Sequence, residues 1–295
     1  MCRLGHQRRS TRTAPTITNN PSSLNAQRNL EGTTVKLTRL LERLRSGLRI
    51  SRASDDPAGL ALSESLRAYI ASYEQAKRNA SDGISLLQIA EGALAESSSL
   101  LTRLRQLSVQ SANSSLGTNE RNALNSEFQL LVGEISRIAN VTEFNGTSIL
   151  NNSGLQVNFQ VGIGNGSNNQ ILVSGVNATA GGLAISGLAI ATSAGASAAI
   201  SAIDAAVGTL ASRRSQLGTA QNRLESTIRS ISVAVKNNTA AESRVRDVDV
   251  AEETSRLTRL QVLQQAGFSV LAQANLTTQT ALQLLCGVVP PIVRG

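Results

Sequence analysis

Between residues 200 and 235, apolar side chains recur every seven positions in two companion rows. The first row is unbroken and consists of Ile203, Leu210, Leu217, Leu224 and Ile231. The second row holds Ile200, Val207, Ile228 and Val235, with Arg214 and Gln221 interrupting it near the middle. This heptad pattern predicts a helix roughly 50 Å long that packs along other long helices. The two polar residues are of the kind that fixes the register or the number of partners.

Similar seams lie near both ends of the chain. The first consists of Leu30, Thr34, Leu37, Leu41, Leu44 and Leu48. The second, in a helix expected from about 249 to 285, consists of Leu257, Leu260, Gly267, Leu271, Ala274, Ala281 and Leu285, with Gln264 and Thr278 as polar members. Loops separate both helices from the rest, and a helix without tertiary burial is marginal. We therefore expect other subunits to order them, which indicates an assembly protein.

Helical patterns also fill the region after residue 56. Asp56 followed by Pro57 predicts a helix start. The helix is expected to run to about residue 113, loosened at Gly83 and Gly92. Its seam is Leu87, Ala90, Leu94, Leu101 and Leu104. Asn119 is expected to cap a shorter helix with the seam Leu124, Phe128, Leu131, Ile135 and Ile138. The central helix is expected to break at residues 236–240.

The composition changes at Thr142. Asn145-Gly146 and residues 151–154 are turn signals. Residues 155–161 alternate apolar with polar, and residues 171–173 are apolar, so they predict the two strands of a hairpin. Residues 174–198 are rich in Gly, Ala and Ser and are expected to be irregular or weakly β-structured.

These elements predict a mainly α fold: a long antiparallel helical rod or coiled-coil bundle with a small central β-hairpin region. The expected segments are a disordered basic arm (1–18), an N-terminal inner helix (19–50), outer rod helices (51–150), the hairpin with a short Gly/Ala/Ser-rich stretch (151–198), the C-terminal rod helix (199–237), a C-terminal inner helix (238–285) and an atypical tail (286–295).

The composition fits thin helical seams better than a thick globular centre. Apolar residues make up 41% of the 295 residues, but aromatic residues only 2%, and charged residues only 16%. The net charge of +8 leaves a basic coiled-coil nucleic-acid binder as one hypothesis. Beyond residues 1–12, however, the arginines are spread thinly and no aromatic residues alternate with them. We found no apolar run of the length that a membrane span needs.

Candidate chemistry is sparse. The two cysteines, Cys2 and Cys286, lie near opposite ends of the chain and there is a single histidine, His6. Without a local cluster of cysteines, no metal site or cofactor is expected. The acid pairs Asp55-Asp56 and Glu252-Glu253 are better explained as helix starts than as catalytic groups. An enzyme is therefore the least favoured class. The two cysteines are expected to be free thiols, with a disulfide between them as the alternative.

A series of short motifs, taken together and in order, resembles bacterial flagellin over roughly residues 17–285. The motifs are SSLNAQRNL (22–30), RLRSGLRI (43–50), ASDDPAGLA (53–61), NASDGIS (79–85), EGAL (91–94), LSVQSAN (107–113), FNG (144–146), AQNR (220–223), RVRDVD (244–249) and QQAGFSVLAQAN (264–275). The chain departs from the family pattern in its first dozen residues, at Pro21, and in the tail after Leu285.

The resemblance implies an inner layer of paired terminal helices, an outer rod with a β-hairpin, and no variable surface domains. It implies export through a flagellar type III apparatus, assisted by a chaperone on the C-terminal helix. It also implies a secreted subunit that polymerises with itself into the flagellar filament and meets hook-associated junction and cap proteins. A hook–filament junction protein is the alternative within this class, although QQAGFSVLAQAN favours flagellin.

In many flagellins the outer rod contacts Toll-like receptor 5. By resemblance the matching positions are Arg103, Leu107, Gln110 and Glu127, while Gln106 stands where many relatives have Glu. The other interpretation of the same residues is packing between subunits of a filament.

Overall fold

The computed structural model describes residues 20–286, with side-chain surroundings as far as Thr280. The basic arm, Cys2, His6 and the tail lie outside the described residues, as do the side chains of Ala281, Leu285 and Cys286. The chain divides into two compact units: residues 1–63 with 242–295 form unit 1, and residues 64–241 form unit 2. We describe each unit by itself. The boundaries expected for the sequence segments remain predictions.

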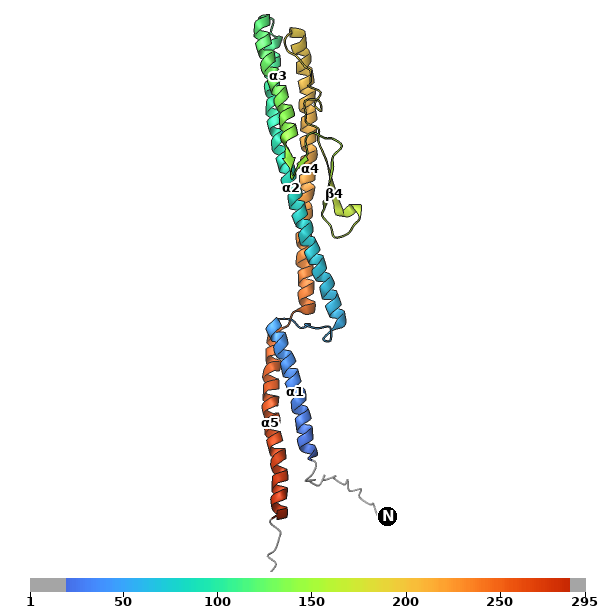
Figure 1. Cartoon of the computed structure of the whole chain (residues 1–295), viewed down its shortest axis with the longest axis vertical. Coiled ribbons are helices and arrows are strands. Elements are labelled where there is room, and N and C mark those ends of the chain that lie inside the picture. Colours follow the sequence, from blue (N-terminus) through green and yellow to red (C-terminus); the bar gives the residue numbers. More distant parts are fainter. Residues whose placement is uncertain (1–19, 287–295) are drawn as a thin grey trace, which may run out of the picture. The chain divides into compact units, whose positions relative to one another are not determined.

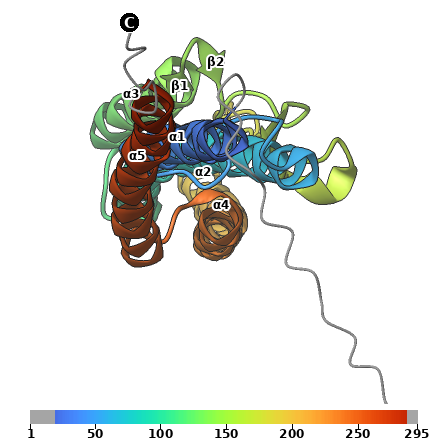
Figure 2. The ribbon, with the colours of Figure 1, turned by 90° about the horizontal axis from the view of Figure 1, so that it is seen from below.

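Unit 1 is built on a pair of helices, α1 (Pro21–Ser46) and α5 (Val250–Cys286), which lie side by side (Figures 1 and 2). They run antiparallel, because the Asn20 side chain donates to the Ala274 carbonyl and Gln264 donates to Thr34. Asn20 also caps α1 by accepting from the Ser23 N–H at 3.2 Å, which leaves Pro21 at the first helical position. Gly47, with a φ of 71°, ends α1.

The contact between α1 and α5 follows one narrow row on each helix. On α5 this row is the predicted one, and it contains Leu257, Leu260, Gln264, Gly267, Leu271 and Ala274. On α1 the predicted row is partly wrong: Leu40 is 6% exposed, whereas Leu41 is 49% exposed. Leu30, Leu37, Leu44 and Leu48 are partly buried as expected. Leu40 and Leu41 lie on either side of the Leu37 row, and a single partner helix covers only one of them.

Unit 2 contains most of α2 (Pro57–Ala112), all of α3 (Thr118–Val141) and most of α4 (Ser193–Arg246). These helices lie along one another (Figure 1) and bury a continuous apolar core. All five residues of the unbroken heptad row of α4 are buried: Ile203, Leu210, Leu217, Leu224 and Ile231. Facing them are the buried seam of α2 and, from α3, Phe128 and Ile135. The predicted seams of α2 and α4 therefore lie in this core.

Several expected helix boundaries were wrong. The helix α4 does not break at 236–240 but continues to Arg246, and it begins already at Ser193. The stretch contains neither Gly nor Pro, and its poorer helix formers each cost less than about 0.7 kcal/mol, which an established helix tolerates. The helix α3 begins at Thr118, and its cap is Gly117, two residues before the expected cap Asn119. The helix α2 runs without interruption through Gly83 and Gly92.

Two small antiparallel hairpins lie between α3 and α4. The strands β1 (Glu143–Phe144) and β2 (Thr147–Ser148) were not expected, although Asn145 and Gly146 were recognised as a turn. Both turn residues have positive φ, 50° and 75°, which is the conformation of the tightest hairpin turns. The predicted hairpin is confirmed as β3 (Gln156–Gln160) and β4 (Gln170–Ser174), in the register Val157 with Val173. A short 3₁₀ turn, Ser167–Asn169, leads into β4.

The segment 175–192 is irregular, as expected, although the irregular stretch was expected to run on to residue 198. Several of its side chains nevertheless belong to the core. Val176, Leu183, Ile185 and Ile190 are all at most 4% exposed. Gly83 of α2 makes room for the neighbouring hairpin, because a β-carbon there would lie 3.2 Å from the Phe159 ring and 3.1 Å from Leu224. The β region therefore packs against the helices of unit 2.

By length and composition alone, helix α4 is long and apolar enough to cross a membrane, whereas the sequence analysis found no apolar run of that length. It contains an 18-residue window with a mean hydropathy of 1.4, of which 28% is buried. Its alanines raise this value, while its large side chains Ile203 and Leu210 are buried against the other helices of unit 2. Asp204 of the same helix pairs with Arg105 at 2.6 Å. The buried part of this window, including Ile203 and Leu210, belongs to the helical core of unit 2.

Candidate assembly surface

The α1–α5 pair exposes more large apolar side chains than it buries. Within the described part of these two helices, only Ala26, Leu40 and Ala274 are buried apolar residues. Nine large apolar side chains are 49–59% exposed: Leu24, Val35, Leu41, Val250, Val262, Leu263, Phe268, Val270 and Leu276. Since full burial of one such side chain is worth about 1.5–3 kcal/mol, covering these half-exposed groups would contribute several kcal/mol per chain. The pair has the composition of a layer that other protein covers.

The segment that follows α1 and the segment that precedes α5, here called the two connectors, are hydrogen-bonded to each other. Leu48 and Asp247 form an isolated antiparallel bridge. The Arg49 N–H donates to the Arg246 carbonyl at 2.7 Å, and the Val248 N–H donates to the Gly47 carbonyl at 3.0 Å. Sequence reasoning missed this arrangement, although both connectors belong to the conspicuous motifs RLRSGLRI and RVRDVD.

Arg43 joins α1 to the neighbouring connector and to α5. Its guanidinium lies 3.7 Å from the Asp55 carboxylate and 3.6 Å from the Glu253 carboxylate. Burial alone would raise the pKa of Asp55, but the N–H groups of Arg52 and Ser51, the Ser51 hydroxyl and the charge of Arg43 outweigh it, so that its pKa is lowered. The carboxylate therefore stays charged in the fold and holds the turn after α1.

Asp56, Glu252 and Glu253 stand at helix starts, as predicted, whereas Asp55 belongs to the turn that precedes α2. Asp56 accepts from the Gly59 N–H at 2.9 Å at the beginning of α2. Asp249 accepts from the Ala251 and Glu252 N–H groups, and Glu252 and Glu253 occupy the first turn of α5. Among the described residues, no group of three or more His, Cys, Asp or Glu side chains has the arrangement of a metal site.

The predicted rod surface contains Arg103, Gln110 and Glu127 but not Leu107. Arg103 donates from Nε and Nη2 to Oε1 of Glu127, at 3.0 and 2.6 Å, and both side chains are about half exposed. Gln110 is exposed. Leu107 is 1% exposed and packs in the core of unit 2, so its placement on this surface was wrong. Its spacing of three from Leu104, itself three from Leu101, was the signal for a core position.

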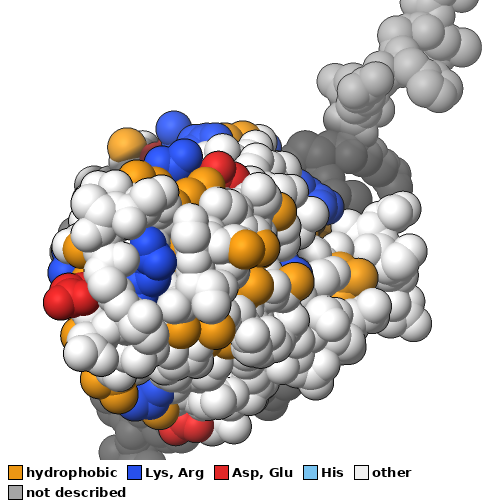
Figure 3. Space-filling model, turned by 90° about the horizontal axis from the view of Figure 1, so that it is seen from above, with side chains coloured by type: hydrophobic (Ala, Val, Ile, Leu, Met, Phe, Trp, Pro, Cys, Tyr) orange, Lys and Arg blue, Asp and Glu red, His pale blue; other side chains and the backbone are white. Residues whose placement is uncertain are grey.

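Most arginines of unit 2 whose side chains contact another group form ion pairs with acids of the same unit. Arg105 with Asp204 and Arg214 with Glu91 each join α2 to α4, at 2.6 Å. The hydrogen bond and charge of Arg105 lower the pKa of Asp204. Arg214 is one of the two polar residues that interrupt the second heptad row of α4. Its ion pair with Glu91 fixes how α2 and α4 align. On the face shown in Figure 3, Lys and Arg side chains are scattered and form no stripe.

Comparisons with known proteins agree with this architecture. The bacterial flagellin N-terminal helical region matches residues 17–154, and the C-terminal helical region matches residues 200–285. A flagellin of Halalkalibacterium halodurans is 45% identical over 269 residues, covering 91% of this chain and 99% of that protein. The flagellar filament 33 kDa core protein of Treponema phagedenis is 40% identical over 283 residues, again covering 91% of this chain and 99% of that protein.

A solved structure also shares the fold. The structure of a putative flagellar hook-associated protein from Vibrio parahaemolyticus has a TM-score of 0.57 and 17% identity, covering 65% of this chain and 100% of that one. At this identity the likeness concerns the fold alone. The two family regions together span most of the described chain, and the relatives match it nearly from end to end. The chain therefore belongs to the bacterial flagellin family.

Proposed function

We propose that the chain is a structural subunit that polymerises with copies of itself into a bacterial flagellar filament, a propeller for swimming, and that it catalyses no reaction. The observation that carries the proposal is the α1–α5 pair, with its nine large half-exposed apolar side chains against three buried apolar residues among the described ones. Flagellin and filament core proteins similar to the chain over their whole length support the same role.

The test is polymerisation of the purified chain, followed by sedimentation and negative-stain electron microscopy. A Leu263→Ser/Phe268→Ser variant removes two large side chains that are 51% and 55% exposed on α5. We expect it to stay monomeric where the parent chain forms filaments. The matched control is Ile163→Ser/Leu172→Ser, two side chains 43% and 44% exposed in the hairpin region. If both double variants polymerise like the parent, the α1–α5 face is not the assembly surface.

The ends of the chain need a separate test. A chain lacking residues 1–12 and 287–295 is compared with the full chain in the same assay. Equal polymerisation means that these ends do not obstruct assembly, whereas polymerisation of the trimmed chain alone identifies them as an obstacle.

The proposal extends to secretion through a flagellar type III apparatus, with a cytoplasmic chaperone holding the α5 region and junction and cap proteins at the filament ends. The exposed apolar side chains of α5 support a chaperone, because they need cover before assembly. Recovery of the chain from the cell surface and medium, lost when the export apparatus is inactivated, is the expected result. Equal amounts outside cells with and without the apparatus contradict this route.

Recognition by Toll-like receptor 5 through Arg103, Gln110 and Glu127 is the second part of the proposal. Its support is the half exposure of the Arg103–Glu127 pair, together with the family resemblance. In a receptor reporter-cell assay we expect Arg103→Ala to reduce signalling by the monomer. The matched control is Arg137→Ala, an arginine of α3 that pairs with Glu134 on its own helix. Unchanged signalling by Arg103→Ala excludes this site.

The hook–filament junction protein and the basic nucleic-acid binder remain alternatives with weaker support. A nucleic-acid binder needs a surface of positive charges that are free to meet phosphates. In this chain many arginines are instead engaged in ion pairs with acids: Arg52, Arg67, Arg103, Arg105, Arg137, Arg214 and Arg256. Binding to duplex DNA with an affinity that falls steeply with salt would favour that alternative. Short assemblies confined to hook ends would favour a junction protein.

A further inference from the structure

Two asparagines of unit 2 are followed directly by glycine, and each pair connects two strands of a hairpin. Asn145-Gly146 forms the turn between β1 and β2, whereas Asn165-Gly166 lies in the loop between β3 and β4. All four residues are exposed. Glycine has no β-carbon to shield its backbone nitrogen, so the neighbouring side-chain amide can approach it. Both sites share this property, and only their surroundings in the fold distinguish them.

The chemistry of such a pair is a ring closure of the asparagine side chain. The backbone nitrogen of the glycine attacks Cγ of the asparagine and forms an N–Cγ bond. The Cγ–Nδ2 bond breaks, and ammonia leaves with the proton of the glycine nitrogen. Water then opens the resulting succinimide ring at either carbonyl, which leaves aspartate or isoaspartate. Water is the only co-reactant, and each event lowers the net charge of the chain by one unit.

The turn at Asn145 holds the backbone in a conformation that opposes this ring closure. Asn145 and Gly146 have φ values of 50° and 75°, the left-handed pair of a two-residue hairpin turn. In the left-handed conformation the nitrogen that follows a residue points away from its β-carbon, whereas the ring needs both on the same side. The flanking residues Phe144 and Thr147 are paired with each other. Closure at Asn145 therefore requires the β1–β2 hairpin to open.

The backbone at Asn165 is not held in that conformation. Among the non-glycine residues that the structure describes, only Asn145 and Ala184 have a positive φ. Within the same part of the chain, neither the Asn165 side chain nor the Gly166 N–H makes a hydrogen bond. The reacting side chain and the reacting nitrogen are therefore both free to meet.

The hydrogen bonds of this loop stop on either side of the reactive pair. Before it, the Gln160 side chain donates to the Gly164 carbonyl at 2.6 Å. After it, the Asn169 N–H donates to the Gly166 carbonyl at 2.9 Å. The loop projects from the helices of unit 2 (Figures 1 and 2). Rotation of the backbone at Asn165 consequently breaks no strand pairing and disturbs no core contact.

We propose that Asn165 is a site of spontaneous deamidation, which converts it to aspartate or isoaspartate with time, while its turn preserves Asn145. The modified fraction follows the age of the molecule, because the reaction needs no enzyme. It places a negative charge in a loop, residues 161–169, whose sequence contains no charged side chain. The site requires only unit 2 of one chain and water, so it does not depend on the filament proposal.

The test is incubation of the purified full chain at neutral and at mildly alkaline pH, followed by chymotryptic peptide mapping with mass spectrometry. Cleavage after Phe159 places Asn145 and Asn165 on different peptides, and the exchange of an NH2 for an OH group is resolved by mass. We expect Asn165 to react at least tenfold faster, because only the open fraction of the β1–β2 hairpin lets Asn145 react. Both rates should rise with pH, since the glycine nitrogen must lose its proton.

A parallel incubation in guanidinium chloride separates the effect of the fold from that of the sequence. In the unfolded chain both Asn-Gly pairs are free, so we expect Asn145 and Asn165 to react at similar rates. A preference for Asn165 that persists unchanged in the denaturant would overturn the proposal, because the fold would then not be its cause. Equal rates at the two sites in the folded chain would overturn it as well.

The variant Gly166→Ala blocks the reaction without disturbing the loop. A β-carbon at Gly166 would lie 3.8 Å from Nδ2 of Asn169, which is an ordinary contact, and the φ of −76° suits alanine. The added methyl group shields the attacking nitrogen, so deamidation at Asn165 should slow at least fivefold. The matched control is Ser167→Ala at the next, also exposed, position, which should change the rate less than twofold. An unchanged rate in Gly166→Ala, or equal slowing in both variants, contradicts ring closure at this site.

Discussion

Gly267 of α5 lies directly against Leu30 of α1: a β-carbon on Gly267 would be 3.2 Å from Cδ1 of Leu30. The side chain of Leu30 thus packs over the bare backbone of α5 at Gly267, where a larger residue would collide with it. The contact occurs inside QQAGFSVLAQAN, so one motif residue has a steric reason that the sequence pattern alone does not reveal.

Replacement of Gly267 should have an effect that depends on size. Gly267→Ala adds one methyl group against the end of the flexible Leu30 side chain and gains about 1 kcal/mol of helix propensity, so we expect polymerisation to be unchanged or improved. Gly267→Leu should separate the two helices and raise the critical concentration for polymerisation at least tenfold. Sedimentation of both variants over a concentration series measures this. An unaffected Gly267→Leu variant would show that α1 and α5 do not need to approach closely.

Gly83 and Gly92 of α2 offer a matched pair. A β-carbon at Gly83 meets the Phe159 ring and Leu224 at 3.1–3.2 Å, whereas one at Gly92 meets nothing within 4 Å. Gly83→Ala should destabilise unit 2 by about 1–3 kcal/mol through overpacking. Gly92→Ala should stabilise it by about 0.5–1 kcal/mol through helix propensity. Urea denaturation followed by circular dichroism compares them, and two shifts of the same sign would contradict the close packing of the hairpin on α2.

Leu210 and Val233 of α4 separate core from surface. Leu210 is 1% exposed and Val233 is 59% exposed. We expect Leu210→Ala to lower the free energy of unfolding by about 2–5 kcal/mol because it leaves a cavity. Val233→Ala should change it by less than about 0.5 kcal/mol. Thermal unfolding of the two variants provides the measurement, and similar losses would mean that the heptad row of α4 is not the centre of the core.

Asp55 should make unit 1 sensitive to acid. Its pKa is lowered in the folded chain, so its stabilising contribution is present in full above the pKa of the unfolded carboxyl, about 3.9, and is lost as the pH falls through the lower folded pKa. Asp55→Asn should reduce stability at pH 6 and flatten its decline between about pH 5 and 3. Asp82→Asn, at an exposed position of α2, serves as the control. Parallel pH profiles for the parent chain and Asp55→Asn would rule out this contribution.

The seven-residue rows were the part of the fold that sequence predicted best. Every residue of the row from Ile203 to Ile231 is buried, and from Ile203 to Leu224 the row belongs to a core to which α2, α3 and the hairpin region also contribute. Between α1 and α5 only one partner is present, and there the pattern could not decide between Leu40 and Leu41. Periodicity predicts a buried side reliably only where enough neighbours cover that side.

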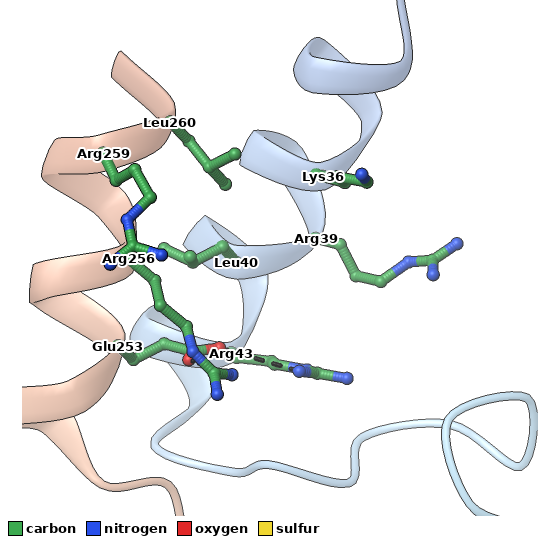
Figure 4. A pocket seen from close by; sticks show the side chains of 8 residues that line it. All are labelled: Lys36, Arg39, Leu40, Arg43, Glu253, Arg256, Arg259 and Leu260. Carbon is green, nitrogen blue, oxygen red and sulfur yellow. Dashed lines mark hydrogen bonds and ion pairs between the residues drawn. The ribbon is translucent and has the colours of Figure 1, made fainter. Parts of the chain in front are cut away.

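Other features depend on contacts that no local pattern encodes. The continuity of α4 through residues 236–240 reflects the cooperativity of a long helix, which outweighs a weak local preference. The Arg43 contacts with Asp55 and Glu253 join residues up to 210 positions apart in sequence, from Arg43 to Glu253 (Figure 4). The resemblance supplied Arg103 and Glu127 as a surface, and only the structure shows that Arg103 donates a hydrogen bond to Glu127 while Leu107 is buried.

The bridge between Leu48 and Asp247 has a consequence for the integrity of the chain. The polypeptide passes through this region twice, once after α1 and once before α5, and backbone hydrogen bonds hold the two passages together. A protease that cleaves one passage, for example after Arg52, leaves the other intact and the cut ends still anchored by α1 against α5. Limited digestion should therefore yield nicked molecules that migrate as whole chains until a denaturant separates the fragments.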